Sequence, residues 1–160
     1  MTPVSERVYL PMTATRLREA LERGSFGPAP LRGHAVTPAV VAALDDDEER
    51  EYAALTAASL VAVAHLTDDD PPLRLVAAVD VTGWDADQGD DPTVVWLPHE
   101  VPWKRLAAVL ADSPDAADAV ARAWAEADAE DDAFLEACLD HELGWFAVQE
   151  VDALLAGLGV

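Results

Sequence analysis

Two short segments of the chain pair a histidine with a glutamate and end in tryptophan: HEVPW at residues 99–103 and HELGW at residues 141–145. A helical zinc-protease motif has two histidines four residues apart on one face, with a glutamate between them as general base. Here Trp103 and Trp145 stand where the second histidine would be. Pro102 also excludes a continuous helix through the first segment. Neither segment alone is therefore a zinc-protease motif.

A composite site is the alternative that these residues leave open. If the fold brings the two segments together, a metal site or an acid–base pair could form from His99, Glu100, His141 and Glu142. Glu150 is a third catalytic candidate, because the aromatic and apolar segment before it could raise the pKa of its carboxyl. The simpler interpretation places both histidines near helix ends and makes Glu150 an N-terminal acid of the last helix. We favour the simpler interpretation and expect no metal.

Residues 83–92 form an aspartate-rich loop. The spacing of Asp85, Asp87 and Asp90 partly resembles that of the ligands in a calcium-binding loop. A helix–loop–helix calcium site needs glycine at its sixth position and glutamate at its twelfth. Counting from Asp85, these positions hold Asp90 and Trp96. The loop is therefore interpreted as a solvated turn, with an adventitious divalent cation site as the alternative.

Other catalytic patterns are weaker still. Cys138 lies among apolar residues of an expected helix, as a small buried hydrophobic residue would. No serine lies in a Gly-x-Ser-x-Gly turn, and no glycine-rich phosphate loop follows an expected strand. We therefore expect no cofactor and lean against an enzyme.

The charge is strongly acidic and unevenly distributed. The chain carries 31 acidic and 10 basic residues, for a formal net charge of −21. Residues 1–34 contain five arginines and three glutamates, so the acidity lies in the remainder. Such a field repels nucleic acid and anionic membrane surfaces, which predicts that neither is bound directly. A surface that mimics nucleic acid toward a basic partner stays open as an alternative.

Cysteine content and hydropathy indicate the compartment. One cysteine permits no intramolecular disulfide, which fits a reducing environment. The N-terminal residues show no basic segment followed by an apolar one, and the apolar runs at 39–44 and 60–64 are too short to span a bilayer. We expect a soluble, cytoplasmic protein.

Local signals predict strands that alternate with helices. Thr13, Thr37-Pro38 and the acidic run at residues 45–51 are typical of helix starts, and Gly24 of a helix end. The last segment is ambiguous, since WFAVQEV could be a strand or could continue the preceding helix; Gly144 favours the strand. The expected strands are 7–10 (ended by Pro11), 34–36, 73–81, 93–97 and 145–151. The expected helices are 14–23, 37–44, 45–66, 102–111, one after Ser113-Pro114-Asp115, one carrying residues 134–139 and a last one capped by Asp152.

These elements predict an α/β fold, or a mixed α+β fold, in one globular domain over residues 1–160. We expect a single sheet of about four to five strands packed with about five to six helices. Residues 8–21 and 94–109 share an apolar strand, Leu-Pro and a following Arg-Leu pair. Independent use of Leu-Pro to end a strand is the simpler explanation of this similarity, and duplication of a βα unit is the alternative.

Four sequence blocks together resemble a known family. They are RVYLP at 7–11, AVTPA at 35–39, EYAAL at 51–55 and DHELGWF at 140–146. In combination they are similar, over nearly the whole chain, to a group of actinobacterial proteins known only as a domain of unknown function. The resemblance implies a cytoplasmic single-domain protein and supplies no reaction, ligand or catalytic residue.

The leading functional hypothesis is a non-enzymatic protein that acts through protein–protein contact or self-association. The contrast between Arg16, Arg18 and Arg23 in the first helix and the acidic remainder could orient a partner. The second hypothesis is a small metal-assisted or acid–base hydrolase that uses His99, His141 and nearby carboxylates. The third is the nucleic-acid mimic.

Overall fold

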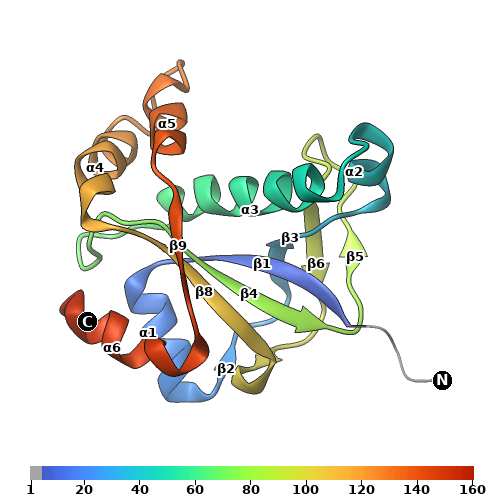
Figure 1. The fold of residues 1–160 in the computed structure, drawn as a ribbon, viewed down its shortest axis with the longest axis horizontal. Helices are drawn as coiled ribbons and strands as arrows, with labels where there is room; N and C mark the ends of the chain where they lie inside the picture. Colours follow the sequence, from blue (N-terminus) through green and yellow to red (C-terminus); the bar gives the residue numbers. More distant parts are fainter. Residues whose placement is uncertain (1–4) are drawn as a thin grey trace.

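The apolar run that begins at Leu73 supplies an inner strand of a seven-stranded antiparallel sheet (Figure 1). This computed structural model describes residues 5–160. The strand order is β5-β6-β3-β1-β4-β8-β9, so β1 and β4 lie inside the sheet while β5 and β9 form its edges. The strands are β1 (Glu6–Met12), β3 (Leu31–His34), β4 (Leu75–Val81), β5 (Asp85–Ala86), β6 (Val94–Leu97), β8 (Leu106–Asp112) and β9 (Leu143–Phe146).

A separate two-stranded ribbon and short helices complete the described residues. The ribbon pairs β2 (Ser25–Phe26) with β7 (Val101–Pro102), and the Phe26 ring stacks on Trp103 at a centroid distance of 5.4 Å. The α-helices are α1 (Ala14–Arg23), α2 (Pro38–Ala43), α3 (Asp47–Ala64), α4 (Ala117–Ala125), α5 (Ala133–Ala137) and α6 (Val151–Gly157). The 3-10 helices are η1 (Trp103–Arg105), η2 (Pro114–Ala116), η3 (Cys138–Asp140) and η4 (Val148–Glu150).

The fold is the mixed α+β alternative and not the α/β fold that was predicted first, since every strand pair is antiparallel; the predicted number of strands was also too low. The prediction of four to five strands missed β5, the β2–β7 ribbon and β8. Strands of two residues carry no periodic pattern, so the sequence gives no signal for them. Six α-helices in the described residues agree with the predicted five to six.

Helices α1, α2 and α3 begin with side-chain caps, and α1 ends at a glycine, as predicted, whereas Ser113 makes no side-chain cap bond. The Thr13 hydroxyl accepts a hydrogen bond from the Arg16 amide, and the Thr37 hydroxyl accepts one from the Val40 amide. Gly24 ends α1 in the left-handed conformation with φ 78°, which glycine adopts without steric cost. In the acidic run, Asp46 is the N-cap of α3, and the acids of the first turn face the positive end of the helix dipole.

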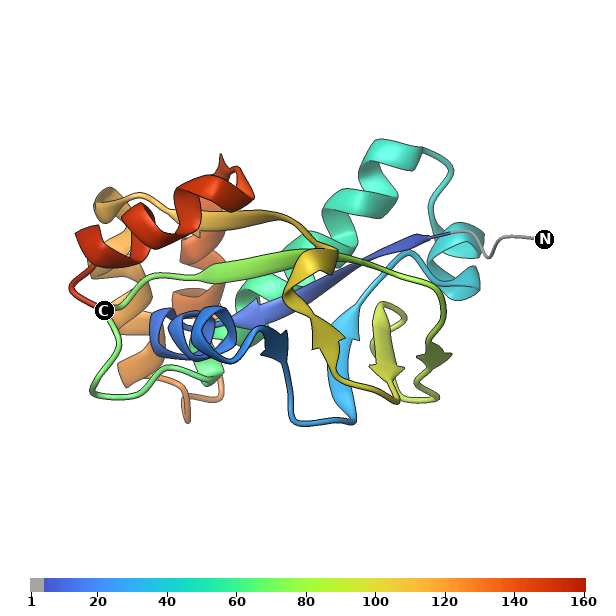
Figure 2. The same ribbon diagram turned by 90° about the horizontal axis from the view of Figure 1, so that it is seen from below.

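Helices cover both faces of the sheet (Figure 2). The side chains of Val8 and Leu10 in β1 belong to the main core, with α1 and α6 packed against it. Tyr9, between them in sequence, faces the opposite side and packs against Ala54 and Ala58 of α3. This alternation is the two-residue period of a strand buried on both faces. A third cluster joins the end of α3 to α4 and Cys138.

The predicted helix at residues 102–111 is wrong. Residues Leu106–Asp112 form strand β8, which lies between β4 and β9, and only the 3-10 turn η1 precedes it. The spacing of Leu106 and Leu110 suits a helix, but the pairing with β4 shifts register near Ala78 and Val79. This irregularity places Leu106 in the main core and Leu110 on the α3 side. Because of the bulge, Leu106 and Val109, three residues apart, both lie in the main core, and this spacing imitates a helical period.

Two other boundaries differ from the prediction. Pro11 does not end β1, which continues to Met12 while Pro11 pairs with Val76. On its other side, β1 pairs with β3 only at Tyr9, so proline removes no ladder hydrogen bond there. The predicted strand at residues 34–36 lies earlier, at Leu31–His34, where it pairs with β6.

The ambiguous C-terminal segment contains a strand. β9 begins at Leu143 rather than Trp145 and pairs with β8, and Glu150 rather than Asp152 precedes α6. Residues 94–109 hold strands and a 3-10 turn, whereas residues 8–21 hold a strand and an α-helix, so the two similar segments differ in structure. Within residues 5–160, none of the helices has both the length and the apolarity that crossing a bilayer requires.

Candidate functional site

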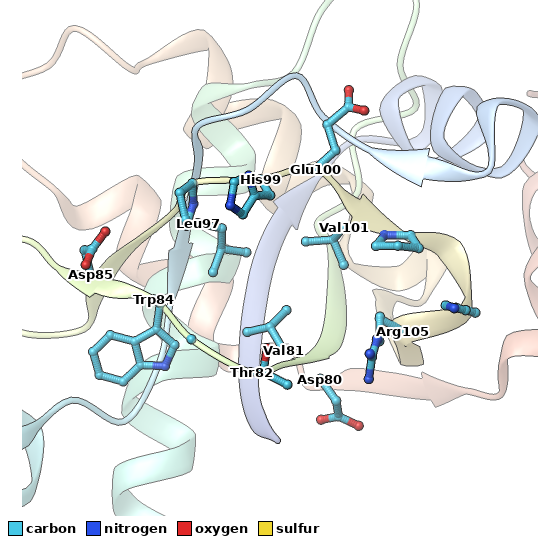
Figure 3. A pocket seen from close by; sticks show the side chains of 14 residues that line it. Asp80, Val81, Thr82, Trp84, Asp85, Leu97, His99, Glu100, Val101 and Arg105 are labelled. Carbon is cyan, nitrogen blue, oxygen red and sulfur yellow. The ribbon is translucent and has the colours of Figure 1, made fainter. Parts of the chain in front are cut away.

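A pocket of about 620 Å³ opens where β4 and β6 end and the chain crosses toward η1 (Figure 3). We call it the His99 pocket. Pro98 follows β6, and the next residues run across the ends of the strands to the β2–β7 ribbon. The side chains that Figure 3 labels are Asp80, Val81, Thr82, Trp84, Asp85, Leu97, His99, Glu100, Val101 and Arg105.

The predicted residues His99 and Glu100 diverge in this pocket. The His99 imidazole lies over the apolar side chains of the pocket, whereas the Glu100 carboxylate points away from it (Figure 3). Arg23 Nη2 donates a hydrogen bond to Glu100 Oε1 at 3.2 Å, which holds that carboxylate toward α1. The two side chains therefore do not converge on one metal ion.

Asp80 and Trp84 form further parts of the wall. Arg7 Nε donates to Asp80 Oδ1 at 2.8 Å, so the Asp80 charge has its own counter-ion. Trp84 is half-buried against the main core, and its Nε1 has no acceptor among the described residues. Thr82 supplies the only hydroxyl among the lining residues, and none of them is a cysteine. The pocket has the mixed polarity of a small-molecule site.

His141 lies in a different pocket, of about 260 Å³, between α3 and the start of β9. Glu142 also lines this second pocket, and neither residue lines the His99 pocket. Across residues 5–160, no three His, Cys, Asp or Glu side chains form a group that could hold a metal ion. The structure therefore separates His99 from His141 and does not assemble the composite site.

A buried ion pair lies beneath the His141 pocket. Arg74 Nε and Nη2 donate to the two carboxylate oxygens of Asp112 at 2.9 and 2.7 Å, and both side chains are almost fully buried. Arg74 also donates to the Ser59 hydroxyl and, at 2.9 Å, to the His141 carbonyl oxygen. The pair ties β4 and β8 to α3 and to the segment before β9. The pair was not predicted, although an arginine within the apolar run at residues 73–81 was its signal in the sequence.

Large apolar side chains are exposed around the same pocket. Tyr52 on α3 is 62% exposed, Leu139 on η3 is 38% exposed and Trp145 on β9 is 65% exposed. Tyr52 and Leu139 line the pocket together with Leu55 and Leu143. Trp145 lies two residues after Leu143 on the same face of β9 and opposite Leu110 of β8. We call these five side chains the Tyr52–Trp145 surface: Tyr52, Leu55, Leu139, Leu143 and Trp145.

The chain matches one known protein family. A family model described as a family of unknown function (DUF6912) matches residues 6–155. The chain belongs to this family. No curated protein and no solved structure gives a significant match. The predicted resemblance to a domain of unknown function is thereby confirmed, and residues 6–155 of the family match contain both pockets and the Tyr52–Trp145 surface.

In this member of the family, the aspartate-rich loop is organised by its own hydrogen bonds. Trp96 Nε1 donates to Asp87 Oδ1 at 3.0 Å and the Gly89 amide donates to Asp87 Oδ2, and these bonds lower the pKa of Asp87. Asp85 lies on β5 and lines the His99 pocket. Asp90 is exposed and belongs to no metal-binding group in the described residues.

Glu150 and Cys138 take structural positions. The Glu150 carboxylate accepts a hydrogen bond from the Ala147 amide and thereby caps η4 before α6. Cys138 is fully buried, and burial raises the pKa of its thiol. A thiol in such surroundings is a poor nucleophile.

The arginines of α1 are engaged within the chain. Arg18 donates to Asp152 and to the Val160 carbonyl oxygen, and Arg23 donates to Glu19 and Glu100. Arg16 instead contacts His65 Nδ1. Internal ion pairs therefore neutralise part of the positive charge of the first helix, which reduces the predicted contrast with the acidic remainder.

Proposed function

We propose that the chain is a protein-interaction domain that binds an extended, basic segment of a partner protein at the Tyr52–Trp145 surface. The observation that carries the proposal is the exposure of Tyr52 and Leu139 in the lining of one pocket, with Trp145 exposed on the same strand as the lining residue Leu143. Tyrosine and tryptophan are enriched at binding hot spots, because they bury large area with few rotatable bonds.

The edge of the sheet supports an extended partner. β9 pairs only with β8 among the described residues, so its other side offers backbone donors and acceptors. A partner strand added there would place alternate side chains over Trp145 and the adjacent pocket. The Arg74–Asp112 pair beneath the pocket holds the segment before β9 through the His141 carbonyl, which limits the entropy lost on binding.

Charge decides the class of partner. Glu142 lines the pocket, and Asp140 lies between the lining residues Leu139 and His141 in the sequence. The whole chain has a formal net charge of −21. A segment with lysine or arginine between its apolar residues is complementary to this rim, and a second copy of the chain is disfavoured by repulsion. The same repulsion argues against nucleic acid as the direct ligand.

The test uses displayed peptides and one matched pair of variants. A random library of extended peptides should enrich sequences that alternate apolar with basic residues. The W145A variant should bind an enriched peptide at least about 30-fold more weakly, as expected for loss of a tryptophan hot spot. Calorimetric titration measures the affinity, and backbone amide shifts in β9 locate the peptide.

The control is V41A, since Val41 is 45% exposed on α2 and does not line the pocket. V41A should bind like the unaltered chain. Enrichment of acidic peptides, or equal losses in W145A and V41A, would contradict the proposal. Competition by duplex DNA for a basic protein partner would instead favour the nucleic-acid mimic.

A further inference from the structure

A third pocket gathers basic side chains in this acidic chain. It has a volume of about 380 Å³ and lies between α1, the segment from β2 to β3 and the end of α3. We call it the Arg16 pocket. Its basic and imidazole side chains are Arg16, Arg23, Arg32 and His65, and it shares no residue with the Tyr52–Trp145 surface.

Two of these arginines lack a carboxylate partner. Glu19, the one acidic residue that lines the pocket, accepts from Arg23 at 3.4 Å. Neither Arg16 nor Arg32 forms an ion pair with any carboxylate of residues 5–160. The charge of Arg32 contributes to the lowered pKa of Asp87, but the Asp87 carboxylate is hydrogen-bonded to Trp96 and Gly89. In a chain with about three acids for each base, two uncompensated cations at one pocket are available to an external anion.

His65 supplies a hydrogen-bond donor in addition to Arg16 and Arg32, because its proton is on Nε2. Arg16 Nη1 lies 3.0 Å from His65 Nδ1, and a guanidinium has only donors, so Nδ1 must accept this bond. The proton of the neutral ring is then on Nε2. Burial, followed by the charges of Arg16 and Arg32, lowers the pKa of His65 and keeps the ring neutral near pH 7. Arg16 is thereby held in place, and His65 Nε2 is a donor.

We propose that the Arg16 pocket binds a small phosphate monoester through Arg16, Arg32 and His65. A phosphate dianion matches the two positive charges, and its three terminal oxygens suit donors that come from three separate side chains. A carboxylate offers only two oxygens and one charge. Apolar walls from Pro28, Leu31 and Trp96 could contact the organic part of the ligand. A long polyanion would meet the acidic remainder of the surface, which selects a small ligand.

Inorganic phosphate is the probe for the first experiment. Titration into the full chain should give saturable binding, followed by the Trp96 indole N–H resonance. R16Q and R32Q should each weaken phosphate binding by about tenfold or more, the usual cost of losing a charge-assisted hydrogen bond. R122Q is the matched control. Arg122 lies on α4, its guanidinium is over the ring of Phe134 on α5, and it also has no ion pair among the described residues. R122Q should bind phosphate normally.

A histidine pair tests the tautomer separately from the charge. H65Q can place its amide N–H near the position of Nε2, whereas the shorter H65N side chain can accept from Arg16 near Nδ1 but places no donor at the position of Nε2. We expect H65Q to bind phosphate better than H65N. Equal loss in R16Q and R122Q, tighter binding of succinate than of phosphate, or no saturation of the Trp96 shift would overturn the proposal. Thermal unfolding of each variant shows that it is folded.

Discussion

At the scale of single residues, His34 is a buried titratable group whose pKa shift affects stability in acid. Its side chain is fully buried, Nδ1 is 2.8 Å from the Thr93 hydroxyl, and Nε2 has no hydrogen-bond partner in the described residues. Burial lowers the pKa of His34 to about 4, although the nearby Asp91 charge opposes the shift. The folded state therefore holds this ring neutral where the unfolded chain would protonate it.

The pH dependence of folding follows from that shift. Between the unfolded pKa of 6.5 and the folded pKa of about 4, the unfolded chain binds more protons than the folded one. The His34 contribution is therefore present above pH 6.5 and is lost as the pH falls toward 4, by about 3 kcal/mol. Urea unfolding at several pH values measures the loss. H34N cannot titrate and should lack this component, and parallel pH profiles for the two proteins would contradict the assignment.

At the scale of elements, the Arg74–Asp112 pair joins β4, β8, α3 and the segment before β9. The Arg74 amide and side chain both donate to the Asp112 carboxylate, and the Asp112 amide donates back to the Arg74 carbonyl. A pair this satisfied is costly to break on one side, because the remaining charge stays buried without a partner.

We expect D112L to lower the free energy of unfolding by about 3–5 kcal/mol. The double variant R74M/D112L should cost less than the sum of its single changes, because it leaves no unpaired charge. D80N is the surface control, since Arg7 and Asp80 are both about 40% exposed, and it should cost no more than about 1 kcal/mol. Denaturant unfolding measures all of these variants. Additive costs in the double variant would show that the two side chains are not coupled.

At the scale of the whole molecule, a net charge of −21 opposes compaction. We expect the midpoint of thermal unfolding to rise as sodium chloride screens this repulsion, over a range in which the Debye length falls from ~30 Å to ~8 Å. The same salt should weaken binding of a basic peptide at the Tyr52–Trp145 surface. A midpoint that falls with salt would indicate that internal ion pairs such as Arg7–Asp80 outweigh the general repulsion.

Local chemistry made part of the fold predictable. Thr13, Gly24, Thr37 and Asp46 act within one turn of their own helix, so their roles follow from residue type alone. The strand from Leu75 was predictable because its apolar run is too short and too continuous for an amphipathic helix. In contrast, Leu106–Asp112 has helical spacing, and only pairing with β4 and β9 makes it a strand.

The candidate sites were less predictable than the fold. The sequence named His99 and His141 by residue type, but whether they meet depends on contacts between distant elements, and they lie in separate pockets. It did not indicate that Tyr52 and Leu139 would be exposed in one of those pockets, or that Trp145 would be exposed on β9. Exposure depends on which neighbours the fold supplies, and a single sequence does not contain that information.

Residue types alone predicted the starts of α1, α2 and α3, the apolar inner strand, the acidic net charge and the resemblance to the family. Each of these depends on residue type or on neighbours within a few positions. Which charges are paired depends on the folded chain: Arg74 pairs with Asp112 in the interior, whereas Arg16 and Arg32 pair with no carboxylate of residues 5–160. The physical reason is that Coulomb energy and desolvation depend on distances and burial in the folded chain, and sequence separation does not set either one.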